Sequence, residues 1–90
     1  MSSALTKPEL TMPELEANLL RDTYAAADVI LEYGSGGSTV LASEMTDKHV
    51  TSVESDKRWW RMMMEWFDGH PAHGTSSVEM LYADIGPTKE

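Results

Sequence analysis

Three acidic residues and one glycine-rich turn are the parts of this sequence that could do chemistry. Glu32 directly precedes a turn that contains Gly34 and Gly36. Glu54 lies 20 positions after Gly34 at the end of a second strand-like run, and Asp84 ends a third. A carboxylate at a strand end can accept hydrogen bonds from both hydroxyls of a ribose. Glycines let the backbone approach a ligand closely and adopt positive φ. The spacing therefore predicts a site for a nucleotide-type ligand.

Alternating helices and strands are needed to bring these residues together. The predicted strands are 29–31, 49–54 and 78–83. The predicted helices begin at Pro13, span 38–45, and run from a cap at Ser55 or Asp56 to about Asp68. This alternation predicts a Rossmann-like α/β fold, with a parallel sheet of strand order 3-2-1 and right-handed crossovers. Because ligands bind at the carboxyl ends of such strands, the three acids should line one rim of one crevice.

The apolar patterns predict which surfaces are buried. The continuous run over 29–31 is typical of a central parallel strand that is covered on both faces. The apolar stripe of the N-terminal helix comprises Leu15, Leu19, Leu20 and Tyr24. The apolar stripe of the third helix comprises Trp59, Met62, Met63, Trp66 and Phe67. We interpret this second stripe as core rather than as an adaptable binding groove.

The composition limits the class of protein. The chain has 90 residues, a net charge of −8, three Trp and 41% hydrophobic residues, which predicts one small domain with a packed core. The acidic balance argues against a general nucleic-acid or membrane-surface binder. There is no cysteine, no apparent signal peptide and no apolar run approaching the roughly 20 residues that span a bilayer. We therefore expect a cytoplasmic location.

No group of residues indicates a metal site or a catalytic centre. His70 and His73 have a spacing that could suggest metal binding, but Pro71 and the predicted loop spoil the pairing. No third ligand is evident, so we predict surface histidines and no metal. No Ser-His-Asp arrangement and no paired acid and base stand out, so catalytic residues are left unassigned.

Two classes of ligand compete for the glycine turn, dinucleotides and S-adenosylmethionine. A dinucleotide brings a pyrophosphate to the turn, and its fingerprint G-x-G-x-x-G needs a third glycine where Thr39 stands. The Glu32 carboxylate would also repel a pyrophosphate. S-adenosylmethionine has a net positive charge, and its ammonium group would give Glu32 a partner, directly or through water. The charges therefore favour the sulfonium ligand.

Three segments carry a family resemblance, in the same order and with familiar spacing. They are LEYGSGGST (31–39), VTSVESD (50–56) and LYADI (81–85). The first resembles the opening motif of class I S-adenosylmethionine-dependent methyltransferases, E-x-G-x-G with a variable tail. The second is similar to that family's ribose-binding strand end, and the third to its adenine-binding segment. Ser38 stands where the family often has a third small residue, which is a mild departure.

The resemblance implies a cofactor-binding role for this chain, with methyl transfer by in-line attack on the sulfonium methyl. Gly34 and Gly36 would shape the turn. Glu32 would orient the methionine end, Glu54 would hold the ribose, and Asp84 with the following backbone N–H would bind the adenine. The residues predicted to bind the cofactor are Glu32, Tyr33, Gly34, Ser35, Gly36, Ser38, Thr39, Glu54, Ser55, Asp84 and Ile85.

The strands that usually supply the substrate pocket in this family have no counterpart in the sequence. We therefore expect a cofactor-binding fragment, with a tail and helix over 1–27 and the N-terminal half of a Rossmann-like domain over 28–90. The exposed edge of the first strand would favour self-association. Two alternatives stay open. One is a fragment of an NAD(P)- or FAD-dependent oxidoreductase, and the other is a non-catalytic interaction module with the same fold.

Overall fold

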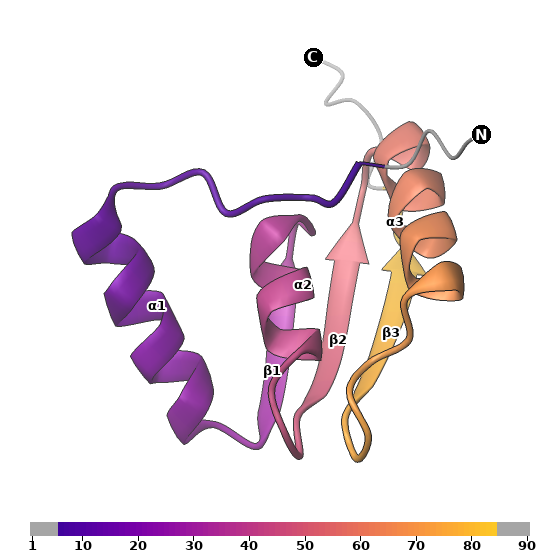
Figure 1. The fold of residues 1–90 in the computed structure, drawn as a ribbon. Helices are drawn as coiled ribbons and strands as arrows, with labels where there is room; N and C mark the ends of the chain where they lie inside the picture. Colours follow the sequence, from indigo (N-terminus) through magenta and orange to yellow (C-terminus); the bar gives the residue numbers. More distant parts are fainter. Residues whose placement is uncertain (1–5, 85–90) are drawn as a thin grey trace.

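Helices and strands alternate in the computed structural model, which describes residues 6–84 (Figure 1). The elements are α1 (Glu14–Ala26), β1 (Val29–Tyr33), α2 (Gly37–Ser43), β2 (His49–Glu54), α3 (Lys57–Gly69) and β3 (Ser77–Tyr82). Every predicted element is present, with boundaries that shift by two residues or fewer. The predicted α/β class is therefore confirmed.

The three strands form one parallel sheet in the order β1-β2-β3, which is the predicted order read from the opposite edge. The register pairs Tyr33 with Val53 and Glu54 with Tyr82. Because all three strands point the same way, their carboxyl ends meet at one edge of the sheet. The turn after β1 and the acid at the end of β2 are thereby brought side by side.

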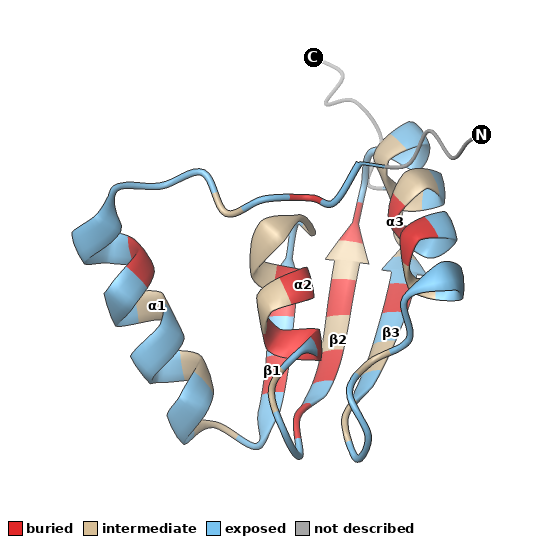
Figure 2. Cartoon of the chain, in the orientation of Figure 1, coloured by how far each residue is buried: buried red, intermediate tan, exposed pale blue. Residues whose placement is uncertain are grey.

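Two helices, α2 and α3, cover one face of the sheet and form the core with it (Figure 2). One buried cluster comprises Val40, Met63, Trp66 and Met80. A second comprises Ile30, Ala42 and Val50. The predicted stripe of α3 is confirmed, because its remaining members pack against the first cluster. Asp56 caps α3 as predicted, accepting hydrogen bonds from the N–H groups of Arg58 (3.0 Å) and Trp59 (3.2 Å).

The opposite face of the sheet is bare in the described part of the chain, so the expectation that β1 is covered on both faces is wrong. Burial alternates along β1: Ile30 and Glu32 are buried, whereas Leu31 is 59% and Tyr33 80% exposed. The physical reason is that α2 and α3 lie on the same side of the sheet (Figure 1). Every second side chain of β1 therefore meets no helix.

The apolar stripe of α1 is buried only in part: Leu20 and Tyr24 are half-buried, and Tyr24 packs against the second cluster. Leu15 is 82% and Leu19 67% exposed. The helix stands beside β1, and polar contacts hold its end. The buried Lys48 side chain donates to the carbonyl oxygen of Ala25 (2.8 Å) and to that of Ala27. A cation near a helix C-terminus complements its exposed carbonyl groups and its dipole.

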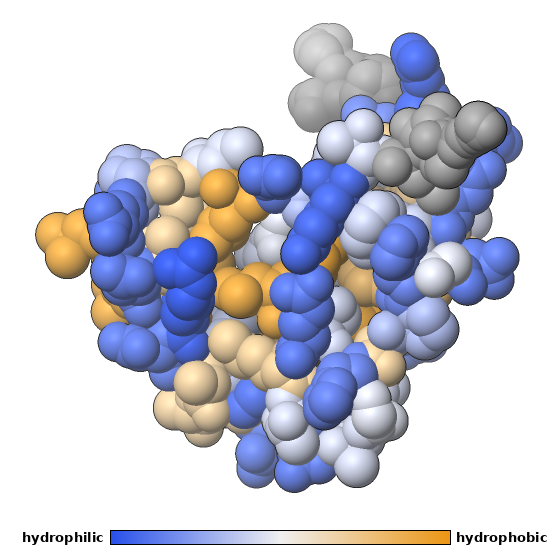
Figure 3. Space-filling model, viewed as in Figure 1, coloured by the Kyte–Doolittle hydropathy of each residue, from blue (hydrophilic) through white to orange (hydrophobic). Residues whose placement is uncertain are grey.

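A hollow with a mixed polar and apolar lining lies between α1 and α2. Apolar surface gathers there on the helix-covered face (Figure 3). The hollow has a volume of about 290 Å³ and is lined by residues that include Leu10, Val40 and Leu41. The N-terminal helix is thus attached to the domain at its end and through a few contacts, and it does not complete the core.

Candidate cofactor-binding site

The glycine turn between β1 and α2 is fixed by hydrogen bonds at three consecutive backbone N–H groups. Gly34 N–H donates to a carbonyl oxygen of β2 at 2.7 Å. Ser35 N–H donates to Oε1 of Glu54 at 2.9 Å. Gly36 N–H donates to Oγ1 of Thr39 at 3.0 Å. All three donors are therefore engaged within the protein.

Only one of the two predicted turn glycines is required by its backbone conformation. Gly34 has φ +95°, in the left-handed region that favours glycine. Gly36 has φ 163°, which is an extended conformation outside the left-handed region. The expectation that both glycines adopt a left-handed φ is therefore wrong for Gly36. A Cβ on Gly36 would lie 3.8 Å from a ring carbon of Trp59, which is ordinary contact. No protein atom demands glycine at position 36, which lines the cavity described below.

Glu54 ends β2 as a buried carboxylate attached to the turn. Its Oε1 accepts from both the N–H and the hydroxyl of Ser35, each at 2.9 Å, and its Oε2 accepts from the N–H of Asp56 at 2.9 Å. Burial acts to raise the pKa of Glu54, but these donors outweigh it, so the pKa lies below its ordinary value. The carboxylate is therefore ionised at neutral pH and held against the turn.

Glu32 is a second buried carboxylate, and it connects β1 to three other elements. Its Oε2 accepts from the Tyr24 hydroxyl of α1 at 2.6 Å. Its Oε1 accepts from Thr39 of α2 at 2.5 Å and from Ser52 of β2 at 3.0 Å. Burial raises the pKa of Tyr24, and the hydrogen bond to Glu32 and the charge of that carboxylate raise it further. Three hydroxyl donors thus compensate the burial of this carboxylate.

Thr39 occupies the position where a dinucleotide fingerprint has its third glycine, and it links the turn to Glu32. Its hydroxyl accepts from the Gly36 N–H and donates to the Glu32 carboxylate. The residue is 0% exposed, so it supports the turn from behind and does not line the cavity. A glycine could make neither side-chain hydrogen bond.

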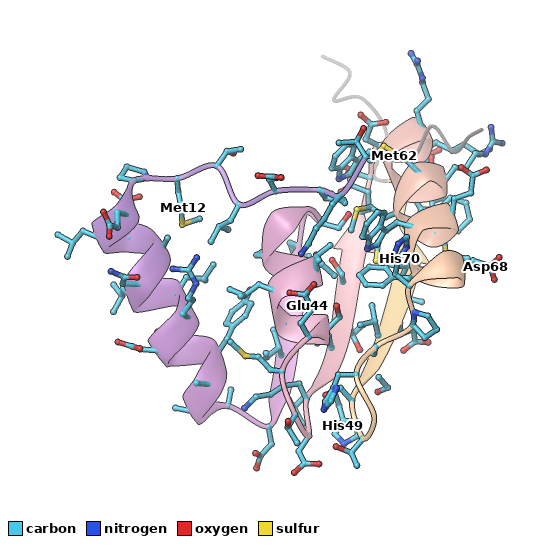
Figure 4. All side chains as sticks on the ribbon, in the orientation of Figure 1. Met12, Glu44, His49, Met62, Asp68 and His70 are labelled. Carbon is cyan, nitrogen blue, oxygen red and sulfur yellow. The ribbon has the colours of Figure 1, made fainter. Side chains whose placement is uncertain are left out.

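A cavity of about 580 Å³ lies against the turn. One wall is the turn itself, from Gly34 to Ser38, and another is residues 6–12, which we call the strap. Trp59 and Met62 of α3 contribute the rest, and Figure 4 shows Met62 at the end of α3 that the strap approaches. Small-molecule sites have volumes of about 300–1,000 Å³, so the cavity is large enough for a nucleoside-sized ligand.

Part of the predicted residue set meets at this cavity. Gly34, Ser35, Gly36 and Ser38 line it. Glu54 is attached to it through Ser35. Glu32 and Thr39 lie behind the turn.

Sequence reasoning missed the strap, Gly37, Trp59 and Met62 as cavity residues. Trp59 packs against the core as predicted, and it also lines the cavity: its Nε1 donates to the carbonyl oxygen of Ser35 at 2.7 Å. The sequence did contain a signal for the role of Trp59 in the cavity. Trp59 lies in the first turn of α3, three positions after the cap Asp56, and that turn sits at the carboxyl edge of the sheet.

Three further residues of the predicted set, Tyr33, Ser55 and Asp84, lie away from the cavity lining. Tyr33 points to the bare face of the sheet, where it is largely exposed. Ser55 and Asp84 are exposed near the carboxyl ends of β2 and β3. Ile85 lies outside the described residues. Contact between these four residues and a cofactor stays a prediction.

His70, which directly follows α3, packs against that helix. The His70 ring stacks on Trp66 with centroids 3.6 Å apart, and its Nδ1 lies 3.0 Å from the Trp66 carbonyl oxygen. Within residues 6–84, no three His, Asp or Glu side chains gather where they could hold a metal ion.

The described helices include none with the length and apolarity to cross a membrane.

Comparison with known proteins gives one informative similarity. No family model matches the chain, and no curated protein matches it. The chain is similar to a methyltransferase-like protein from Silicibacter pomeroyi DSS-3, known from a crystal structure, with 56% sequence identity and a TM-score of 0.86. The match covers 93% of this chain and 43% of that chain, so the chain spans less than half of its neighbour's length. Over the matched length, the chain has the Rossmann-like α/β fold of a methyltransferase-like protein.

Proposed function

We propose that this chain binds S-adenosylmethionine and forms the cofactor-binding part of a methyltransferase. The similarity to a methyltransferase-like protein supports a methyltransferase-like function. The choice of cofactor rests on one observation: the backbone N–H groups of residues 34–36 are all committed to acceptors of the protein itself.

This commitment disfavours a dinucleotide. In dinucleotide sites the turn offers backbone N–H groups to the pyrophosphate. Here the N–H groups of Ser35 and Gly36 already donate to side chains. Glu54 bonds the turn directly and Glu32 bonds it through Thr39, so two carboxylates would repel the phosphates. The same charges attract a ligand that carries an ammonium and a sulfonium group.

The residues of this chain would hold and orient the cofactor, which when bound would supply an electrophilic methyl group. Glu54 has about four acceptor positions, of which its present donors use three. A ribose hydroxyl could take the fourth position or replace the Ser35 hydroxyl, while the Ser35 N–H keeps the carboxylate in place. Gly36 lines the cavity without a side chain, which would admit the ligand close to the backbone.

Calorimetric titration of the full chain with S-adenosylhomocysteine and with NAD tests this proposal. S-adenosylhomocysteine keeps the ammonium, the ribose and the adenine and lacks the transferable methyl group. We expect binding of S-adenosylhomocysteine and not of NAD. Binding of NAD alone would overturn the proposal in favour of an oxidoreductase fragment. Binding of neither would favour a non-catalytic interaction module.

A Glu54→Gln variant tests the ribose assignment separately. Hydrogen bonds to charged groups contribute about 1.5–3 kcal/mol, so we expect at least about a tenfold loss of S-adenosylhomocysteine affinity. Glu65→Gln is the control, because Glu65 is exposed on α3 and does not line the cavity. Thermal melting followed by circular dichroism verifies that both variants are folded. Unchanged affinity in a folded Glu54→Gln variant shows that the assignment is wrong.

A further inference from the structure

The strap forms one of the two main walls of the cavity. It runs from the start of α1 across α2 toward the N-terminal end of α3 (Figure 1). Residues 6–12 all line the cavity, together with the glycine turn. Pro8 is buried, whereas its neighbours Lys7 and Glu9 are exposed. A ligand in the cavity would therefore contact the strap and the turn at the same time.

The backbone of the strap rests directly on Gly37. A Cβ on Gly37 would overlap the carbonyl group of Glu9 and the backbone nitrogen of Leu10. Backbone atoms cannot rotate away as the tip of a side chain can, so any larger residue at position 37 must displace the strap.

The conformation of Gly37 itself does not call for glycine. It is the first residue of α2 and is not among the glycines with positive φ. Inside a helix, glycine is about 0.5–1 kcal/mol less favourable than alanine. The close approach of the strap is therefore the physical reason for glycine at this position.

The second attachment of the strap is weak. Lys7 Nζ lies 3.0 Å from Oε2 of Glu44, and both side chains are about half exposed (Glu44 is labelled on α2 in Figure 4). Exposed ion pairs contribute about 0–1 kcal/mol. The strap continues into α1, whose Leu15 and Leu19 make no buried stripe. The backbone seat on Gly37, the buried Pro8 and one weak ion pair therefore hold this wall.

We propose that the strap is a detachable wall of the cofactor cavity and that Gly37 is the positioning residue that seats it. The seating follows from the contacts above, whereas the identity of the ligand rests on the proposed function. A ligand that contacts both walls stabilises the docked strap, and the docked strap raises the affinity for the ligand. Linkage makes these two effects reciprocal.

A glutamate-specific protease tests the seating in the ligand-free chain. Cleavage between Glu9 and Leu10 requires the strap to leave Gly37. We expect Gly37→Ala to accelerate this cleavage about tenfold, within the usual range of coupling between two sites, without lowering the melting temperature. Gly69→Ala is the matched control, since a Cβ there meets nothing within 4 Å. Cleavage after Glu65, inside α3, reports global unfolding. Equal cleavage rates after Glu9 in the Gly37→Ala variant and the unmodified chain overturn the seating.

A second measurement tests the coupling to the ligand. Saturating S-adenosylhomocysteine should slow cleavage after Glu9 in the unmodified chain. Gly37→Ala should raise the ligand dissociation constant about tenfold, measured by tryptophan fluorescence to which Trp59 in the cavity wall contributes. If the ligand binds but neither effect is seen, the wall proposal is overturned and the proposed function stands. If the unmodified chain binds no S-adenosylhomocysteine, the proposed function fails, and the cleavage comparison in the ligand-free chain still decides the seating.

Discussion

Two buried carboxylates define the chemistry of the site at the scale of single residues. Glu54 is held by backbone N–H groups and one hydroxyl, and Glu32 by three hydroxyls. The donors to Glu54 outweigh its burial and keep its pKa below the ordinary value. Each donor is therefore needed, because removing one leaves a buried acceptor without its partner.

Tyr24→Phe should destabilise the chain for this reason. The variant keeps the ring and removes one donor to Glu32, so we expect a loss of about 1.5–3 kcal/mol in the free energy of unfolding, measured by urea denaturation. Tyr33→Phe is the control. Tyr33 is largely exposed on the bare face of the sheet, and its variant should stay within about 0.5 kcal/mol of the unmodified chain. A loss of the same size in both variants would contradict the role of Tyr24.

The ionisation of Glu54 predicts how stability depends on acid pH. The pKa of Glu54 is lowered in the folded state, so its contribution to stability is complete above the ordinary value of 4.5 and is lost as pH falls through the lowered pKa. Urea denaturation from neutral pH down through this range should show a decline. Glu54→Gln should have a flatter profile, because it has no proton to take up at this position. Parallel profiles would contradict the pKa shift.

At the scale of elements, the two glycines of the turn have different roles: Gly34 is needed for the backbone conformation, and Gly36 for space in the cavity. Gly34→Ala should destabilise the fold by about 1–2 kcal/mol, because φ +95° is unfavourable for a residue with a Cβ. Gly36→Ala should leave the free energy of unfolding within about 0.5 kcal/mol, because a Cβ there makes only ordinary contact. Its S-adenosylhomocysteine affinity should fall, since the added methyl group occupies the cavity. Urea denaturation and calorimetry measure the two effects. Unchanged affinity in Gly36→Ala contradicts close approach of the ligand there.

The bare face of the sheet is a feature of the whole molecule that exposes several large apolar side chains. Val29, Leu31, Tyr33 and Leu81 are exposed on it. Exposed apolar surface next to an unpaired strand edge favours association. We expect concentration-dependent self-association in sedimentation velocity and a clear reduction of it in Leu31→Lys. Leu15→Lys should have no such effect, because that leucine is even more exposed than Leu31 but lies on α1. A monodisperse monomer at every concentration would contradict this expectation.

The alternation of elements, the strand order and the core of the third helix could all be predicted, because they depend on local patterns. Asp56 caps α3 through its own neighbours, and Met63 and Trp66 recur at helical spacing. The site could be predicted in part for a similar reason. Parallel strands put residues that follow β1 and residues that end β2 at one edge of the sheet, so the spacing from Gly34 to Glu54 sufficed.

Long-range contacts decided what the sequence pattern left open. An apolar run in the sequence does not indicate on which face of a sheet the helices will pack. Leu31 and Tyr33 are exposed because α2 and α3 both cover the opposite face. Hydroxyl groups far apart in the sequence converge on Glu32 only after folding. The strap reaches Gly37 in the same way. The sequence by itself therefore determined the α/β fold, and it predicted the class of ligand that the site would bind. The tertiary structure decided how the carboxylates are held and which segment closes the cavity, because both depend on residues that only the folded chain brings together.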